Sequence, residues 1–305
     1  MIIIGVIFIL LKFFLFLKLY LSFKPITVIP NSVYTKTTSY NYINIISLGI
    51  GKKKKLALRG TFNLIQSIKY EYLSPEIYAS YYINMFHKIF VNKHSKNNIL
   101  ILGNAAGTFL SGVIHFCNEN NINNISFDVV EIDKEFTKVG EKFFDMPTND
   151  KRIKFFYEDA RTFLNRQNEK KYDIIFYDIY TSDTYIVPYY LITKQAFKNI
   201  ADKMNNDGIL VMNVIGETKK ESKKTMYLRQ IYTQIKSVFK YTKIYKVNAF
   251  DYDYGNYLVA GWNKTNKEIT ETTNFLKTLE VKNIKENSEI FTDNYCPIEK
   301  FLEFY

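Results

Sequence analysis

Residues 99–107, ILILGNAAG, begin the stretch of sequence that decides the fold. The apolar run is typical of a strand, a glycine turn ends it, and a helical pattern follows over residues 108–119. Further on, the largely apolar run 172–177, YDIIFY, is typical of a strand that helices cover on both faces. Because alternating strands and helices imply a parallel sheet, the chain is predicted to have an α/β, doubly wound fold.

The remaining elements are predicted from the same alternation. Strands are expected at residues 99–102, 126–132, 153–157, 172–177 and 208–214, with a closing hairpin at 241–248 and 256–262. Helices are expected at 108–119, 134–144, from about 160, at 194–204 and near 220–239. Upstream, residues 40–72 predict a small β region, and Pro75 opens a helix over 75–91. The chain is thus divided into 1–24, a β-hairpin region with a helix over 25–92, and an α/β domain over 93–305.

Four successive predicted strands end in a glycine turn or an acid. These positions are Gly103 with Gly107, Glu131, Asp159 with Ala160, and Asp178 with Asp183. In a doubly wound sheet, ligands bind beyond the carboxyl ends of the strands. An acid at Glu131 can accept both hydroxyls of a ribose, and a carboxylate at Asp159 can accept from an adenine amino group. We therefore expect a nucleoside site in a Rossmann-like sheet of the S-adenosylmethionine-dependent methyltransferase type.

Each of these residues also has a purely structural explanation. Gly103 can serve only a tight turn, Asp159 and Asp183 can cap helices, and Asp178 can cap the loop that follows it. NAD is disfavoured, because the chain has no G-x-G-x-x-G and no loop to cradle a pyrophosphate. The nucleoside interpretation rests on the four strand ends together.

From about residue 40 onward, the sequence resembles the polyamine aminopropyltransferases, the spermidine synthase family, and in particular its divergent membrane-linked branch. The matching segments are RGTFNLIQS (59–67), YINM (82–85), the glycine turn, VVEID (129–133), YEDAR (157–161), YDIIFYDIYTSD (172–183), LITKQAF (191–197), GILVMNV (208–214) and TDNYCPIE (292–299). The resemblance implies transfer of an aminopropyl group from decarboxylated S-adenosylmethionine, a co-substrate, to a polyamine, with no permanently bound cofactor.

The resemblance also assigns roles to residues. Gln66 and Glu131 would hold the ribose and Asp159 the adenine, with Gly103, Gly107 and Ala160 completing this site. Asp178 would be the base or charge partner for the attacking amine, and Tyr82 would help position that amine. Asp183 and Tyr180 would bind the amine substrate. On physical grounds alone, a carboxylate at the pocket mouth suits a reaction that needs a deprotonated amine.

Two positions depart from the family pattern. Ala106 stands where the family carries an acid before the last glycine of the turn, and Ile83 stands where the family tends to have a polar side chain. Restoring the acid, Ala106→Asp, is expected to raise aminopropyl transfer. An S-adenosylmethionine-dependent methyltransferase and a non-catalytic nucleoside-binding membrane protein stay open as alternatives.

The N-terminal run 2–23, IIIGVIFILLKFFLFLKLYLSF, is long enough to cross a bilayer as a helix. Lys12 and Lys18 oppose insertion, although Lys18 can reach an interface. We expect a retained anchor, with a cleaved signal peptide or an interfacial helix as the alternatives. Basic residues follow the run, so the positive-inside rule predicts a single-pass membrane protein whose catalytic domain faces the cytoplasm. The Lys52–Lys55 run suits an anionic leaflet, and equally a solvated turn.

Composition excludes several classes of protein. The net charge of +11 is concentrated at the start: the first 70 residues hold ten basic residues and no acid, and the rest holds 31 basic and 30 acidic residues. A near-neutral body predicts no nucleic-acid partner. Two cysteines and three histidines exclude a disulfide framework and disfavour a metal site. The oligomeric state is not set by the sequence, and a homodimer stays open.

Overall fold

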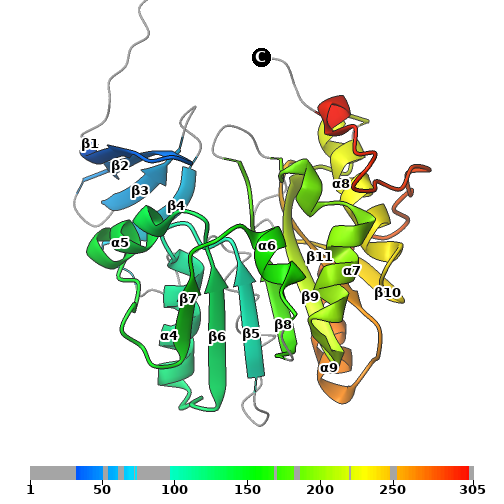
Figure 1. The fold of residues 1–305 in the computed structure, drawn as a ribbon, viewed down its shortest axis with the longest axis horizontal. Helices are drawn as coiled ribbons and strands as arrows, with labels where there is room; N and C mark the ends of the chain where they lie inside the picture. Colours follow the sequence, from blue (N-terminus) through cyan, green and yellow to red (C-terminus); the bar gives the residue numbers. More distant parts are fainter. Residues whose placement is uncertain are drawn as a thin grey trace, which may run out of the picture.

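The computed structural model describes residues 32–50, 54–60, 65–71, 73, 97–167, 170–181, 186–219, 221–247 and 253–301. Within these ranges the chain forms one large sheet with helices on both faces and one small sheet (Figure 1). The predicted anchor over 1–24 and the predicted helix over 75–91 lie outside the described residues. No helix among the described residues is long and apolar enough to span a bilayer.

The large sheet has the strand order β10-β11-β9-β8-β5-β6-β7. Its strands are β5 (Asn97–Leu102), β6 (Ile125–Val130), β7 (Ile153–Phe156), β8 (Tyr172–Tyr177), β9 (Met204–Gly216), β10 (Tyr241–Lys246) and β11 (Gly255–Trp262). Strands β5 to β9 are parallel, as predicted, and the closing hairpin inserts β11 antiparallel to β9. The sheet is therefore mixed. Strand β9 begins earlier than predicted, because Met204 already pairs with Tyr172 on β8.

Helices cover the sheet on both faces. They are α4 (Thr108–Glu119), α5 (Lys134–Phe143), α6 (Ala160–Asn165), α7 (Lys194–Asp202), α8 (Lys223–Lys236) and α9 (Lys267–Phe275). Side chains alternate between the faces along a strand. Ile99 and Ile101 thus pack with α4 and α9, while Leu100 and Leu102 pack with α6, α7 and α8. Burial on both faces explains why the central strands lack a polar face.

The small antiparallel sheet consists of β1 (Ser32–Thr37), β2 (Tyr42–Leu48), β3 (Lys55–Arg59) and β4 (Ile65–Tyr70). It lies above the carboxyl ends of the parallel strands (Figure 1). An apolar cluster that includes Ile43, Leu58 and Phe136 joins it to α5. Asp133 adds polar contacts, because its Oδ2 accepts from Thr38 Oγ1 at 2.5 Å and from Asn41 Nδ2 at 2.9 Å. The predicted β region is confirmed, and β1 extends it upstream.

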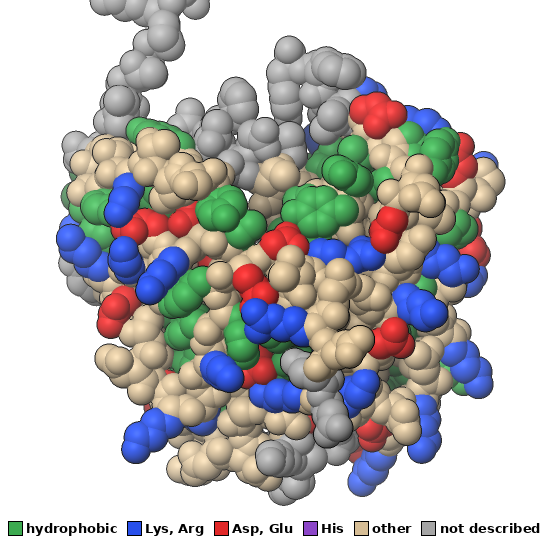
Figure 2. All heavy atoms as spheres, in the orientation of Figure 1, with side chains coloured by type: hydrophobic (Ala, Val, Ile, Leu, Met, Phe, Trp, Pro, Cys, Tyr) green, Lys and Arg blue, Asp and Glu red, His purple; other side chains and the backbone are tan. Residues whose placement is uncertain are grey.

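Charged side chains are distributed over the surface without a continuous basic band on the face seen in Figure 2. Blue and red side chains are interspersed there across both the small sheet and the α/β body. This pattern agrees with the near-equal numbers of basic and acidic residues beyond residue 70.

Candidate functional site

A cavity of about 650 Å³ lies between the small sheet and the carboxyl ends of β5, β6, β8 and β9. The strand order reverses between β5 and β8, and such a switch point is where doubly wound sheets bind ligands. Of the residues predicted for the site, the cavity is lined by Gln66, Gly103, Glu131, Asp159, Ala160, Asp178 and Tyr180. The sheet topology thus brings together residues that are far apart in the sequence.

The glycine turn brings β5 and β8 into close backbone contact. Gly103 has a φ of 82°, and a Cβ there would lie 2.3 Å from the carbonyl oxygen of Asp178. Gly107 also has a positive φ, 74°, and packs against Met146. Glycine is therefore required at both positions. Gly107 ends the turn before α4 and does not line the cavity, so the structure supports a turn role for it.

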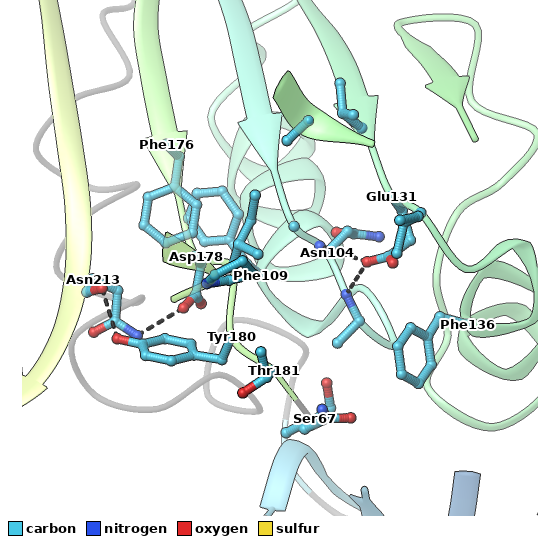
Figure 3. Close-up of a pocket in the computed structure, with 18 of the residues that line it drawn as sticks. Ser67, Asn104, Phe109, Glu131, Phe136, Phe176, Asp178, Tyr180, Thr181 and Asn213 are labelled. Carbon is cyan, nitrogen blue, oxygen red and sulfur yellow. Dashed lines mark hydrogen bonds between the residues drawn. The ribbon is translucent and has the colours of Figure 1, made fainter. Parts of the chain in front are cut away.

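Glu131 is 7% exposed and holds the glycine turn in place (Figure 3). Its Oε2 accepts from the backbone N–H groups of Asn104 at 3.1 Å and Ala105 at 3.0 Å, and its Oε1 accepts from that of Asp133 at 3.0 Å. Burial raises the pKa of the Glu131 carboxyl, while these three N–H groups oppose the rise. A carboxylate oxygen can accept two hydrogen bonds, so Oε1 keeps room for a ribose hydroxyl.

Gln66 approaches the same cavity from strand β4 of the small sheet. Its Oε1 is buried and has no hydrogen-bond partner among the described residues. The neighbouring Ser67 is engaged, since its Oγ accepts from the Ala106 N–H at 3.3 Å. Buried acceptors are normally satisfied, and a ligand hydroxyl would supply the donor that Gln66 lacks. This orphaned oxygen fits a nucleoside sugar bound between Gln66 and Glu131.

Asp159 caps a helix and also lines the cavity. Its Oδ1 caps helix α6 by accepting from the Thr162 N–H at 3.0 Å, so the structural explanation is correct. Its Oδ2 accepts from the Tyr190 hydroxyl at 2.9 Å. Asp159, Ala160 and Tyr190 all line the cavity, so the cap does not remove the carboxylate from the site. Tyr190 was not predicted, because its contact with Asp159 joins residues from different connections of the fold.

Asp178 follows β8 and is held by the neighbouring strand (Figure 3). Asn213 Nδ2 on β9 donates to Asp178 Oδ1 at 2.8 Å. The Tyr180 hydroxyl donates to the Asn213 carbonyl at 2.7 Å and accepts from the Ile215 N–H at 3.1 Å. Tyr180 therefore fixes the loop after β8 to β9, and it also lines the cavity. Asn213 was not predicted as a site residue, although a polar residue within the apolar run 208–214 is a usable signal.

Phe109 and Phe176 form an aromatic wall beside Asp178, with ring centroids 4.2 Å apart in a stacked arrangement (Figure 3). Tyr82 and Asp183, predicted to contact the amine, lie outside the described residues. Their roles stay predictions. No group of three or more His, Cys, Asp or Glu side chains suited to a metal ion occurs in the described part of the chain.

Ala106 does not face the cavity, contrary to what its position in the motif suggested. Its side chain is fully buried, at 0% exposure, in the apolar cluster between the small sheet and α5. The expectation that Ala106→Asp would add a useful acid is therefore disfavoured. A carboxylate there would lie among apolar side chains such as Phe136 and Val139.

The tail segment 292–299 closes the fold beside the site. Arg161 Nη2 donates to Asp293 Oδ2 at 2.7 Å, and Arg161 Nη1 donates to the Tyr190 carbonyl at 2.8 Å. Thr193 Oγ1, which caps α7, donates to Asp293 Oδ1 at 2.5 Å. The tail therefore clamps the start of α6 to the start of α7.

Comparison with known proteins identifies the family. A sequence model described as the spermine/spermidine synthase domain matches residues 79–273, which is more than half of the chain. The chain belongs to this family. Polyamine aminopropyltransferase from Clostridium beijerinckii is 26% identical over 164 residues, 53% of this chain and 54% of that protein. The Prochlorococcus marinus enzyme of that name is 24% identical over 225 residues, 70% of this chain and 72% of that one.

The chain therefore spans about half the length of the first of these relatives. Among solved structures, a probable spermidine synthase from Corynebacterium glutamicum superposes with a TM-score of 0.61 at 16% identity, covering 84% of this chain and 98% of that one. Human methyltransferase-like protein 13 in complex with SAH superposes with a TM-score of 0.51 at 14% identity, covering 66% and 92%. Both similarities show the Rossmann-like, methyltransferase-type fold shared by the spermidine synthase family.

Proposed function

We propose that this chain is an aminopropyltransferase that moves an aminopropyl group from decarboxylated S-adenosylmethionine to a polyamine. The observation that carries the proposal is one cavity with two ends: Glu131 and the orphaned Gln66 oxygen at one, and Asp178 at the other. The first end fits the sugar of a nucleoside and the second fits a cationic amine. Membership of the spermidine synthase family and structural similarity to a spermidine synthase in complex with the transition state analogue AdoDATO support the same chemistry.

The reaction needs little acid–base chemistry from the protein. The amine nitrogen uses its lone pair to form a bond to the carbon beside the sulfonium, and the C–S bond breaks with its electrons going to sulfur. Methylthioadenosine leaves as a neutral thioether, so the leaving group needs no proton. The amine must lose one proton, and the Asp178 carboxylate can accept it. Asn213 holds that carboxylate in a fixed orientation, which favours in-line attack.

The proposal is tested by product formation. The full chain is incubated with putrescine, spermidine or longer amines and with either form of the donor, and products are measured by mass spectrometry. Asp178→Asn should lower the rate by about 10²–10⁴-fold, the usual contribution of a positioned base. Methylthioadenosine affinity should barely change, because Asp178 lies at the other end of the cavity from Glu131. Raising the pH should partly rescue the variant by deprotonating the amine in solution. Equal losses of affinity and stability would instead assign Asp178 to holding its loop.

A methyltransferase is the second candidate, and the burial of Ala106 favours it. The family's acid at this position would meet the amino end of the aminopropyl group, and here the side chain packs in an apolar cluster. Methylated product from S-adenosylmethionine, without aminopropylated amine from the decarboxylated donor, would replace the leading proposal.

We further propose that residues 2–23 anchor the enzyme in a membrane with the catalytic domain on the cytoplasmic side. The proposal is supported by the apolar run and by basic residues that follow it.

A further inference from the structure

Tyr190 is a feature of the cavity that the family resemblance does not account for. It belongs to a short 3-10 helix, Tyr189–Leu191, and its ring lines the cavity beside Asp159. Its hydroxyl donates to Asp159 Oδ2 at 2.9 Å. A phenol has one proton to donate and lone pairs with which to accept. Once that proton points at Asp159, Tyr190 can present only an acceptor to a ligand.

Asp159 also presents only hydrogen-bond acceptors to a ligand. Its Oδ1 accepts from the Thr162 N–H and its Oδ2 accepts from Tyr190, and each oxygen has capacity for another hydrogen bond. Burial and the adjacent Asp159 raise the pKa of Tyr190 to about 12, so the phenol stays protonated at neutral pH. This end of the cavity therefore offers hydrogen-bond acceptors from both side chains.

The backbone of Tyr190 is fixed as firmly as its hydroxyl. Arg161 Nη1 donates to its carbonyl at 2.8 Å, and Arg161 is itself held by Asp293. Pro188 and Leu191, which flank Tyr190 in the chain, also line the cavity and are apolar. An apolar wall with a rigid polar end suits a flat heterocycle whose edge carries the polar groups.

We infer that Tyr190 sets the base specificity of this nucleoside site. Because its hydroxyl proton is donated to Asp159, this part of the cavity presents only hydrogen-bond acceptors to a ligand, which selects a 6-amino purine over a 6-oxo purine. The inference rests on the proposed function, since it concerns the base of the same donor. A 6-amino group donates hydrogen bonds to these acceptors. A 6-oxo group is itself an acceptor and would face the Asp159 carboxylate and the Tyr190 oxygen with no donor between them, a mismatch that binding sites reject strongly.

The test compares 5′-methylthioadenosine with 5′-methylthioinosine by isothermal titration calorimetry on the full chain. Wild type should bind the adenosine compound at least about 100-fold more tightly. Tyr190→Phe keeps the ring and removes the hydroxyl, so a water molecule can take its place beside Asp159 and donate a hydrogen bond to a 6-oxo group. In this variant the ratio of the affinities for methylthioadenosine and methylthioinosine should fall by about tenfold, the order expected for one hydrogen bond to a charged group. Tyr189→Phe is the matched control, because Tyr189 is 52% exposed and does not line the cavity; its preference should equal that of wild type.

The unfolding midpoint of each variant is measured alongside the titrations. An unchanged preference in Tyr190→Phe, whether or not affinity or stability falls, would overturn the inference and leave Tyr190 a structural residue. Equal wild-type affinity for both compounds would overturn it as well, while the nucleoside site itself would stand. Binding of neither compound would refute the proposed function, and the inference with it.

Discussion

Glu131 illustrates how one buried carboxylate both shapes a loop and prepares a binding site. It accepts hydrogen bonds from three backbone N–H groups, two of them in the glycine turn. The sequence predicts the ribose role from the position of this acid after a strand. It does not predict the contacts with the turn, since these depend on the left-handed conformations of Gly103 and Ala105, with φ values of 82° and 44°.

We predict that Glu131→Gln weakens methylthioadenosine binding by about 1–3 kcal/mol, the range for a hydrogen bond to a charged group. Stability should fall too, because the amide NH₂ would face a backbone N–H that the carboxylate now satisfies. Calorimetry and thermal unfolding measure the two effects. Asp178→Asn serves as the control, for which affinity should stay near that of wild type. Wild-type affinity in Glu131→Gln would show that the sugar lies elsewhere.

Ala106→Asp is expected to destabilise the protein by about 3 kcal/mol or more, because an unpaired charge would be buried in an apolar cluster. Chemical denaturation measures the change in the free energy of unfolding. Ala105→Asp is the matched control: Ala105 lines the cavity, and aspartate tolerates its positive φ better than most residues. A stable and more active Ala106→Asp would show that its side chain reaches the cavity.

At the scale of elements, residues of α5 help to hold the small sheet to the α/β domain. Tyr34 and Lys36 on β1 contact Glu135, with a hydroxyl–carboxylate distance of 3.0 Å and an ammonium–carboxylate distance of 2.9 Å. The ion pair with Lys36 lowers the pKa of Glu135 to about 2. The small sheet carries Gln66, so these contacts also keep one wall of the cavity in place.

A pH dependence follows from the lowered pKa of Glu135. Its ordinary value is 4.5, so its contribution to stability is complete above pH 4.5 and is lost as the pH falls toward 2. We predict that Glu135→Gln lowers the unfolding midpoint at neutral pH. Between pH 4.5 and 2 the midpoint of this variant should fall less steeply than that of wild type. Glu141→Gln, an exposed change on the same helix, should keep the wild-type profile. Identical profiles for wild type and Glu135→Gln would rule out this ion pair as a stabilising contact.

Most elements beyond residue 97 could be predicted, because their burial patterns are local, although helix α9 (Lys267–Phe275) was not predicted. Helix α4 and strand β8 have the predicted bounds. Strand β1 was not predicted, since SVYTKT is largely exposed and becomes a strand only by pairing with β2. Asn213, Tyr190 and the Arg161–Asp293 pair escaped prediction for a related reason: their partners are distant in sequence, and only the folded sheet brings them together.

At the scale of the whole molecule, the distribution of charge separates a basic beginning from a near-neutral body. The first 70 residues carry ten basic residues and no acid, and they include the apolar run over 2–23. The proposed anchor concerns residues 2–23, whereas the cavity is lined by residues from Tyr40 onward. The two parts can therefore be tested separately.

We predict that the full chain sediments with membranes and resists carbonate extraction, whereas residues 25–305 stay in the supernatant. The physical reason is the burial of the apolar run in lipid, which the truncated chain lacks. Immunoblotting of the fractions measures the partition, and methylthioadenosine binding checks that the truncated chain is folded. Recovery of the full chain in the soluble fraction would contradict the anchor.

The Arg161–Asp293 clamp has a consequence for biosynthesis. The two residues are 132 positions apart, and Asp293 joins Arg161 and Thr193 only after the tail has returned to α6 and α7. A chain emerging from a ribosome can assemble β5 to β8 and the glycine turn long before Asp293 has been translated. The part of the cavity beside Asp159 and Tyr190 is then completed last, so an unfinished or prematurely terminated chain would leave the cavity open there.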